Sequence, residues 1–420
     1  MLNRNNGHYI CALDIGSTKI SGAVAEIRSK SIINITCDTV LSSSLKNGVI
    51  VNSMDLVNET GLILKKLKAK SGLKIREVYV NISGEDIIVK NSHAIIPLAE
   101  RGNKIVTKRD ISRVIEQARI LGSSLEEEII HQIPTNYSID SMHKVENPID
   151  LYSHKLEAEL YLICVKLVSV QNLLRVVSQA GYEVKDVYFS GLATGKAMLG
   201  KDYIGKKTLV CDIGGDFTEM SFFYGDAIRD IDILYEGGNS LTSRLCDELK
   251  IPFELAEDVK RSYGIIGDNA VNEDKEILIK KDNIYKPIKQ KFVSEIITSQ
   301  VNILCQDIKR AIEKKTALSG LDYLFLCGRT VLLEGFLEAL EHALGCPVKL
   351  ARFYDRHIFD LLKKNPDFSG HKYITYVTAL GMISQAIHSK RHQEKDQLSS
   401  SKNPLFDLLN RVSEVYQEYF

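Results

Sequence analysis

The sequence has no excess of either charge and no cluster of residues spaced as metal ligands. Its 54 lysines and arginines balance 54 aspartates and glutamates, so the formal net charge is zero. A nucleic-acid-binding protein usually shows a basic excess or stripe, and we therefore expect no nucleic-acid partner. The ten histidines show no ligand spacing, which argues against a zinc site or a metal-dependent nuclease.

Paired cysteines and long apolar runs are also missing. None of the eight cysteines forms a C-x-x-C pair and several lie within apolar segments, a pattern typical of buried free thiols in a reducing cytosol. The chain has no run of about 18 apolar residues, so we expect no spanning helix. Residues 1–8 lack the apolar core of a signal peptide, and any membrane contact is expected to be peripheral, at the cytoplasmic face.

The length and the periodicity indicate an α/β protein with more than one domain. A chain of 420 residues is too long for one ordinary core. Apolar strands alternate with amphipathic segments along most of it. Residues 85–160 differ, because several short strands surround a single predicted helix, Lys108–Leu121. We interpret this stretch as a small α+β insertion.

The first motif with chemical content is Asp14-Ile15-Gly16-Ser17-Thr18-Lys19, which lies between two predicted strands. A glycine in a tight turn lets backbone N–H groups approach a phosphate closely. Ser17 and Thr18 add hydroxyl donors, Lys19 adds a positive charge, and Asp14 is placed to hold Mg²⁺ directly or through water. The alternative is an ordinary hairpin turn.

The second motif repeats this frame about 200 residues later. An apolar strand again ends in Asp212, one apolar residue and a glycine, and the turn continues through Gly214, Gly215, Asp216 and Phe217. Two such turns in facing lobes would clamp the phosphates of a nucleotide, with Asp14 and Asp212 directed toward one Mg²⁺. The repetition predicts nucleotide binding more strongly than either turn alone.

Three further places fit the same ligand. Glu257 and Lys260 share one face of a predicted helix, where they would flank the adenine or ribose; a surface ion pair is the alternative. Gly237 and Gly238 would allow the backbone to approach a ligand closely; the alternative is that they only form a turn. Gly328 and Arg329 follow a strand and precede a helix. This position would form a shelf that supports the nucleotide base; the alternative is an ordinary strand–helix junction.

The C-terminal segment Pro404–Phe420 follows a polar stretch, Lys390–Lys402, which we predict to be a flexible linker. Its apolar residues fall on one helical stripe, which is typical of an amphipathic helix that lies on a membrane surface. Alternatively, this helix docks on its own protein or a partner, or pairs as a coil. The stripe consists of Leu405, Phe406, Leu408, Leu409, Val412, Val415, Tyr416, Tyr419 and Phe420.

Together these residues resemble FtsA, the actin-like bacterial cell-division protein family. The first phosphate turn, Leu45–Ile50, Ile130–Pro134 and Tyr137–Asp140 are similar to family landmarks, and the last two lie in an insertion peculiar to the family. The resemblance implies an actin/Hsp70-like (ribonuclease H-like) two-lobed ATPase fold with ATP and Mg²⁺ in the cleft. It also implies head-to-tail filaments, binding of the C-terminal tail of FtsZ, contacts with other division proteins, and a terminal helix that targets the cytoplasmic membrane at the division site.

The resemblance also implies a division into subdomains. Subdomain 1A would comprise 1–84 and 166–204 with the helix 376–388, and the insertion, subdomain 1C, would comprise 85–165. Subdomain 2A would comprise 205–244 and 316–375, and subdomain 2B, the FtsZ-binding part, 245–315. Residues 389–403 would be the linker and 404–420 the membrane-targeting helix.

The sequence departs from the family pattern inside the second turn and at the base shelf. Asp216, Phe217 and Glu219 replace a glycine, a threonine and an aspartate, and Arg329 replaces a glycine. A carboxylate beside phosphates repels them unless a metal bridges the two. Arg329 would stack on the adenine or block it. Subdomain 2B carries Thr298-Ser299-Gln300 where an acid and an arginine are usual.

These departures leave two other functions open. One is a nucleotide-independent scaffold with a degenerate cleft, and the other is an adaptor of type IV pilus assembly of the PilM kind. The stretch Ser190–Thr194 has no acid or amide to position a water. We therefore expect at most a slow ATPase and assign no catalytic residue.

Overall fold

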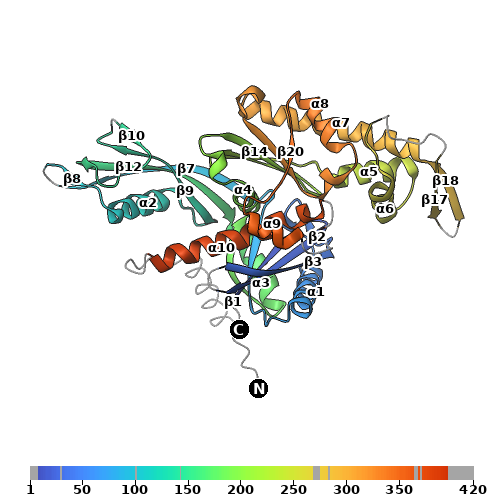
Figure 1. Cartoon of the computed structure of the whole chain (residues 1–420), viewed down its shortest axis with the longest axis horizontal. Coiled ribbons are helices and arrows are strands. Elements are labelled where there is room, and N and C mark those ends of the chain that lie inside the picture. Colours follow the sequence, from blue (N-terminus) through green and yellow to red (C-terminus); the bar gives the residue numbers. More distant parts are fainter. Residues whose placement is uncertain are drawn as a thin grey trace, which may run out of the picture.

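The protein is built around two five-stranded sheets with the same strand order (Figure 1). The computed structural model describes residues 8–28, 31–99, 102–141, 143–267, 275–281, 284–363, 368 and 371–395. The first sheet has the order β13-β6-β1-β2-β3: Glu183–Phe189, Glu77–Ile82, His8–Ile15, Lys19–Arg28 and Ser31–Leu41. The second has the order β20-β19-β14-β15-β16: Lys349–Leu350, Tyr323–Cys327, Lys207–Ile213, Thr218–Tyr224 and Ala227–Leu234.

The two sheets also agree in strand direction. β1 pairs antiparallel with β2 and parallel with β6, and β14 pairs antiparallel with β15 and parallel with β19. In the first hairpin Asp14 lies opposite Ser21, and in the second Asp212 lies opposite Glu219. The repeated strand–turn–strand motif of the sequence therefore marks the same place in two equivalent sheets, and the actin-like fold class is confirmed.

Helices cover the first sheet on both faces, which explains why β1 is buried almost without interruption from Ile10 to Leu13. The helices α1 and α3 pack together on one face, and α4 and α10 pack together on the other. The close crossing of α10 and α4 requires Gly381, because a Cβ there would lie 2.1 Å from the carbonyl oxygen of Ala193. These helices are α1 (Ser53–Ser71), α3 (Leu167–Gln179), α4 (Ser190–Met198) and α10 (Val377–Lys395).

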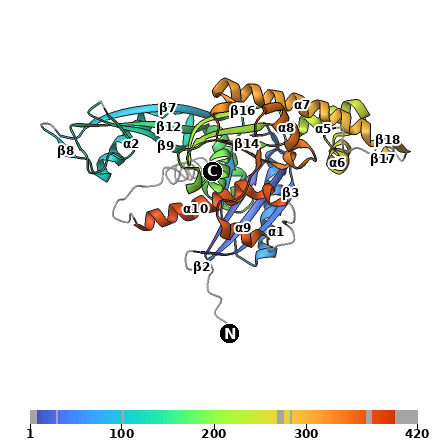
Figure 2. The same ribbon diagram turned by 45° about the horizontal axis from the view of Figure 1, so that its top comes forward.

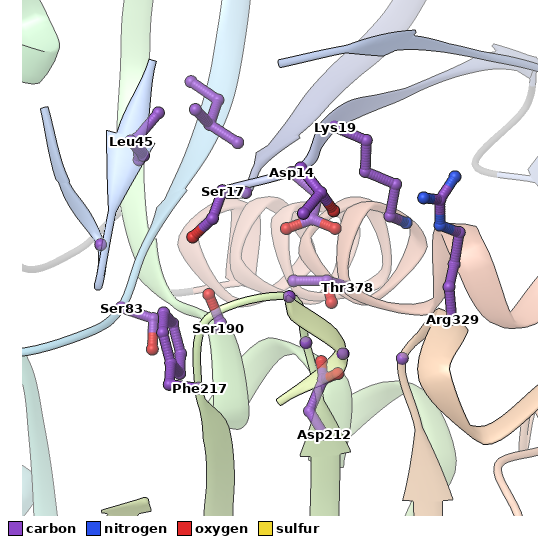
Figure 3. Close-up of a pocket in the computed structure, with 18 of the residues that line it drawn as sticks. Asp14, Ser17, Lys19, Leu45, Ser83, Ser190, Asp212, Phe217, Arg329 and Thr378 are labelled. Carbon is purple, nitrogen blue, oxygen red and sulfur yellow. The ribbon is translucent and has the colours of Figure 1, made fainter. Parts of the chain in front are cut away.

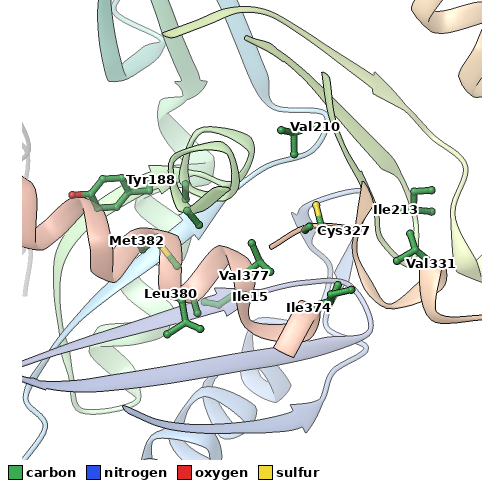
Figure 4. Close-up of a cluster of buried hydrophobic side chains, with 14 of the residues drawn as sticks. Ile15, Tyr188, Val210, Ile213, Cys327, Val331, Ile374, Val377, Leu380 and Met382 are labelled. Atoms are coloured by element: carbon green, nitrogen blue, oxygen red, sulfur yellow. The ribbon is translucent and has the colours of Figure 1, made fainter. Parts of the chain in front are cut away.

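One apolar core joins the two sheets (Figure 4). Val210 and Ile213 of β14 face Val377 of α10 across the region between the lobes, with Cys327 at the end of β19 beside them (Figure 4). The cavity between the lobes therefore lies next to an apolar core that both sheets share, and Cys327, Ile374 and Val377 belong to both.

The insertion is a separate four-stranded sheet with one helix, at the left of Figure 1. Its own core packs α2 against β7 and β12. Thr107 caps α2 and forms a capping box with Asp110. The sheet order is β10-β9-β12-β7, and the elements are β7 (Ile87–Pro97), β8 (Lys104–Ile105), α2 (Lys108–Gly122), β9 (Glu127–Ile139), β10 (His143–Val145), β11 (Tyr152–Ser153) and β12 (Lys155–Lys166).

A histidine joins the insertion to the first sheet. His131 on β9 accepts the backbone N–H of Phe189, the last residue of β13, at 2.9 Å. Its ring also packs on Tyr188. Burial lowers the pKa of His131 to about 3, so the ring is neutral and its Nε2 serves as an acceptor.

Helices extend the second sheet at the end opposite the insertion (Figures 1 and 2). The strands β17 and β18 pair antiparallel next to these helices. The elements are α5 (Gly238–Leu249), α6 (Phe253–Tyr263), β17 (Glu276–Lys281), β18 (Ile284–Lys289) and α7 (Gln290–Lys315). The remaining elements are β4 (Leu45–Lys46), β5 (Val49–Ile50), η1 (Lys201–Tyr203), η2 (Leu318–Gly320), η3 (Arg329–Leu332), α8 (Phe336–Leu344), α9 (Arg356–Lys363) and η5 (Lys372–Tyr376).

The linker was predicted to begin before the point where the preceding helix ends. Helix α10 continues to Lys395, so the backbone of residues 389–395, placed in the linker at first, is helical. The segment from Lys390 to Lys395 contains no glycine or proline to end a helix, and lysine, arginine, glutamine and glutamate all favour one. The predicted membrane helix, Pro404–Phe420, lies outside the described residues.

Candidate functional site

A cavity of about 320 Å³ lies between the two sheets and is lined by residues of both lobes. Asp14, Ser17 and Lys19 enter it from the first sheet, and Asp212 and Phe217 enter it from the second (Figure 3). Arg329 enters from the end of β19. The structure thus brings the two turns predicted from the sequence to opposite walls of one cavity.

The two turns have the same local geometry. The N–H of Gly16 donates to the carbonyl of Lys19 at 3.0 Å, and the N–H of Gly214 donates to the carbonyl of Phe217 at 3.0 Å. Within the described chain, the N–H groups of Ser17 and Gly215 have no acceptor, nor do those of Thr18 and Phe217. Free backbone N–H groups that line a cavity are suited to an anion.

The turns touch each other. A Cβ on Gly215 would lie 2.4 Å from Cγ2 of Thr18, so a larger residue at this position would push the lobes apart. Gly328 is equally constrained, since its φ is +87° and a Cβ would lie 2.2 Å from the carbonyl oxygen of Ile213. The cavity depends on glycine at both places.

Asp14 and Asp212 point into the cavity from opposite sides (Figure 3). Burial raises the pKa of Asp14 to about 6, with Lys19 opposing that rise and Asp212 adding to it. Burial also raises the pKa of Asp212. Two desolvated carboxyl groups that destabilise each other's ionised form would be relieved by a cation held between them. This arrangement fits Mg²⁺, held directly or through water by oxygen ligands.

Lys19 is anchored at the edge of the first turn. Its Nζ donates to the hydroxyl of Ser21 and to the carbonyl of Thr375, both at 3.0 Å. Burial lowers the pKa of Lys19 to about 8, and Asp14 partly reverses this effect. Both recorded partners of the ammonium are neutral, so its charge remains available to an anion in the cavity.

The second turn is held in place by the N-terminus of α5. The N–H of Gly238 donates to the carbonyl of Gly214 at 2.9 Å, and the hydroxyl of Thr330 donates to the same carbonyl at 3.0 Å. Gly237 is required there, because a Cβ would lie 2.6 Å from the carbonyl oxygen of Gly215. Gly238 lines the cavity, whereas Gly237 supports the turn from behind.

Asp216 does not line the cavity, contrary to the expectation that its carboxylate stands beside the phosphates. Its Oδ2 accepts the backbone N–H of Asn47 at 3.0 Å, and its Oδ1 accepts the side-chain amide of Asn239 at 2.7 Å. The side chain turns away because these two donors hold it. Asp216 therefore connects the β4–β5 hairpin of the first lobe to the second lobe. Phe217 does line the cavity, near Ser83 (Figure 3).

Glu257 and Lys260 both line the cavity, but Lys260 is occupied. Its Nζ lies 2.5 Å from Glu257 Oε2, 2.8 Å from the carbonyl of Gly238 and 2.7 Å from the hydroxyl of Thr242. These three acceptors use all three donors of the ammonium. Lys260 holds Glu257 and α5 in place, which leaves Glu257 as the member of the pair with an oxygen free for a ligand.

Asn81, Ser83 and Glu219 are among the residues of the cavity lining that were not predicted as site residues. Asn81 on β6 donates to Asp14 at 2.8 Å and accepts the N–H of Ile15 at 2.6 Å. Glu219 accepts the hydroxyl of Ser83 from the other lobe, and burial raises the pKa of Glu219 to about 8. Asn81 and Glu219 are polar residues inside apolar strands, which is the signal that could have identified them.

Two family models match the chain. The first, described as "SHS2 domain inserted in FTSA", matches residues 84–164, and the second, described as "Cell division protein FtsA", matches residues 209–381. The chain belongs to the FtsA family. Among curated relatives, the FtsA of Borreliella burgdorferi is 25% identical and the match covers 94% of both chains. The FtsA of Pseudomonas aeruginosa is 24% identical and covers 100% of both.

Solved structures with the same fold are more distant. A PilM-PilN type IV pilus biogenesis complex has a TM-score of 0.59 at 17% identity, covering 90% of this chain and 98% of that one. MreB5 of Spiroplasma citri, bound to AMPPNP, has a TM-score of 0.51 at 12% identity, covering 92% and 98%. At these identities the likeness shows the actin-like fold alone.

The described residues contain neither a membrane-spanning helix nor a cluster of metal-ligating side chains. None of their helices is both long and apolar enough to cross a bilayer. No group of three or more His, Cys, Asp or Glu side chains there is arranged to hold a metal ion. The Mg²⁺ site that Asp14 and Asp212 suggest would therefore be completed by the ligand's own oxygens and by water.

Proposed function

We propose that this FtsA-family chain binds ATP with Mg²⁺ in the cavity between its lobes. The observation that carries this proposal is the pair of equivalent turns, each with free N–H groups and a strand-end aspartate, on opposite walls of one cavity. Gly16–Thr18 and Gly214–Phe217 would hold the phosphates. Glu257 and the strand end at Gly328 would receive the nucleoside. The AMPPNP-bound MreB5 of similar fold is consistent with this assignment.

Asp14 and Asp212 would hold Mg²⁺, which would shield the phosphate charge from the two carboxylates. The first turn of α4, Ser190–Thr194, carries no acid or amide. We therefore propose at most slow hydrolysis of the bound ATP.

Equilibrium binding of a fluorescent ATP analogue tests the nucleotide site. We expect saturable binding with a Kd well below 1 mM in the presence of Mg²⁺. Asp14→Asn and Asp212→Asn should each remove most of the Mg²⁺ dependence, since each eliminates one metal-facing charge from a different lobe. Asp202→Asn, an exposed aspartate outside the cavity, is the matched control. Absence of saturable binding below millimolar concentration would refute this part of the proposal.

We further propose that the protein polymerises and tethers FtsZ filaments to the cytoplasmic membrane at the division site. Family membership supports this role, together with the amphipathic pattern of Pro404–Phe420. The C-terminal tail of FtsZ would bind the subdomain formed by α5, α6, α7 and the β17–β18 hairpin. Lys289 lies where that hairpin meets α7 and would offer positive charge to an acidic tail.

A nucleotide-independent scaffold is the second candidate. Asp216 favours it, because its hydrogen bond to Asn47 joins the lobes without a ligand. The binding experiment above separates the two candidates. A PilM-like adaptor role has only the fold likeness to the PilM-PilN complex in its favour, while both family models point to cell division.

A further inference from the structure

Arg329 is a cation without a partner at the wall of the cavity. It follows Gly328 at the end of β19 and begins the short helix η3. Its guanidinium has no hydrogen bond or ion pair with any described residue. Glu257 and Tyr376 both act on its charge, and the Glu257 carboxylate is already bonded by Lys260 and Thr242. A partly desolvated guanidinium with five unused donors calls for an anionic acceptor.

The side chain extends along one side of the cavity toward the end of the Lys19 side chain (Figure 3). In Figure 3 Arg329 extends from the second lobe to the level of Lys19, beyond the strand end from which it starts. Its charge acts on Lys19, where it adds to the lowering of the lysine's pKa, and Arg261 of α6 acts in the same way on Arg329. Two cations from opposite lobes thus act on one another at the wall of the cavity. Such repulsion is relieved when a multiply charged anion binds between them.

We propose that Arg329 binds the phosphate chain of the nucleotide, bridging it to Lys19 from the opposite lobe, and does not stack on the base. This assignment rests on the proposed nucleotide site and specifies its ligand as a nucleoside di- or triphosphate. The guanidinium fork donates two parallel hydrogen bonds to phosphate oxygens, which adds an attraction independent of Mg²⁺. The base is then left to contact other residues of the cavity lining, among them the apolar side chains of Leu332 and Leu333.

Competition experiments with the full chain test this assignment. ATP, ADP and adenosine are each used to displace a fluorescent ATP analogue, with and without Mg²⁺. Loss of one charge-assisted contact costs about 1.5–3 kcal/mol, so Arg329→Ala should weaken ATP and ADP binding roughly 10- to 100-fold. Adenosine affinity should stay unchanged, and the weakening of ATP should persist without Mg²⁺. Arg329→Lys should recover part of the loss by restoring the charge.

Arg352→Ala removes an exposed arginine outside the cavity and should leave all affinities unchanged. Equal losses of affinity for adenosine and for ATP in Arg329→Ala would mean that Arg329 stacks on the base. Tighter ATP binding by Arg329→Ala would mean that Arg329 blocks the site. Either result overturns the inference, and so does an ATP affinity that Arg329→Ala leaves unchanged. If the unsubstituted chain binds no nucleotide, the proposed function fails and the inference fails with it.

Discussion

At the scale of single residues, a carboxylate next to a phosphate-binding turn can either repel the phosphates or bind another part of the chain. From its position in the chain, Asp216 was expected to repel bound phosphates. In the folded protein the backbone N–H of Asn47 and the amide of Asn239 hold it outside the cavity. Its charge is therefore used to join the lobes, and the cavity is lined by other residues of this turn, Gly214, Gly215 and Phe217.

Removing this link should make the cleft open more easily. We expect Asp216→Ala to speed dissociation of a bound fluorescent ATP analogue about five-fold, since an ordinary hydrogen bond contributes about 1 kcal/mol. Dissociation is measured by stopped flow after mixing with excess ATP. Asp202→Ala serves as the exposed control. A slower release, or tighter binding without Mg²⁺, would show instead that Asp216 repels the phosphates.

At the scale of elements, the insertion is connected to the cavity between the lobes through one strand end. His131 of β9 accepts the N–H of Phe189, and the next residue, Ser190, accepts a hydrogen bond from Asn81 at 2.9 Å. Asn81 in turn bonds Asp14 and Ile15 of the first turn. This series of hydrogen bonds requires His131 to be neutral, because a protonated ring cannot accept an N–H.

This contact predicts a pH dependence of stability. The pKa of His131 is about 3 in the folded protein and about 6.5 when unfolded. The unfolded state therefore binds the extra proton first, and the free energy of unfolding falls as pH drops below 6.5, by up to ~1.4 kcal/mol per pH unit. His131→Gln keeps an acceptor without the titration. Its loss of stability between pH 7 and 5 should be smaller than that of the unsubstituted protein.

Urea unfolding at pH 7, 6 and 5 measures this difference. His154→Gln, an exposed histidine of the same insertion, is the matched control and should keep the original pH profile. Identical profiles for all three proteins would contradict the assignment of a neutral, accepting His131.

At the scale of the whole molecule, the two equivalent sheets place one cavity between two lobes. The lobes are joined below the cavity by the apolar core around α10 and beside it by Asn47–Asp216 and Ser83–Glu219. A nucleotide bound by both turns would add a third connection. In a filament-forming protein, such a ligand links the state of the cleft to the shape of the subunit.

The proposed tethering role gives the prediction at this scale. Full-length protein should co-sediment with anionic liposomes, and deletion of Pro404–Phe420 should abolish this binding, because the deletion removes the only strongly amphipathic segment that follows the folded lobes. Deletion should leave ATP binding unchanged, which serves as the internal control for folding. Full-length protein that remains in the supernatant would reject the anchor.

The sequence by itself located the two strand–turn–strand motifs, each with an aspartate at a strand end followed by a glycine, and their repetition indicated two equivalent lobes. It also marked the α+β insertion. It did not show which way the Asp216 and Arg329 side chains point. The partners of Asp216 are 23 and 169 residues away in the chain, and Arg329 lies at the boundary between the lobes. Such distant pairings are decided only when the lobes pack together. Tertiary structure therefore turned a predicted repulsion at Asp216 into a link between the lobes, and a shelf residue at Arg329 into a cation facing the phosphate turn.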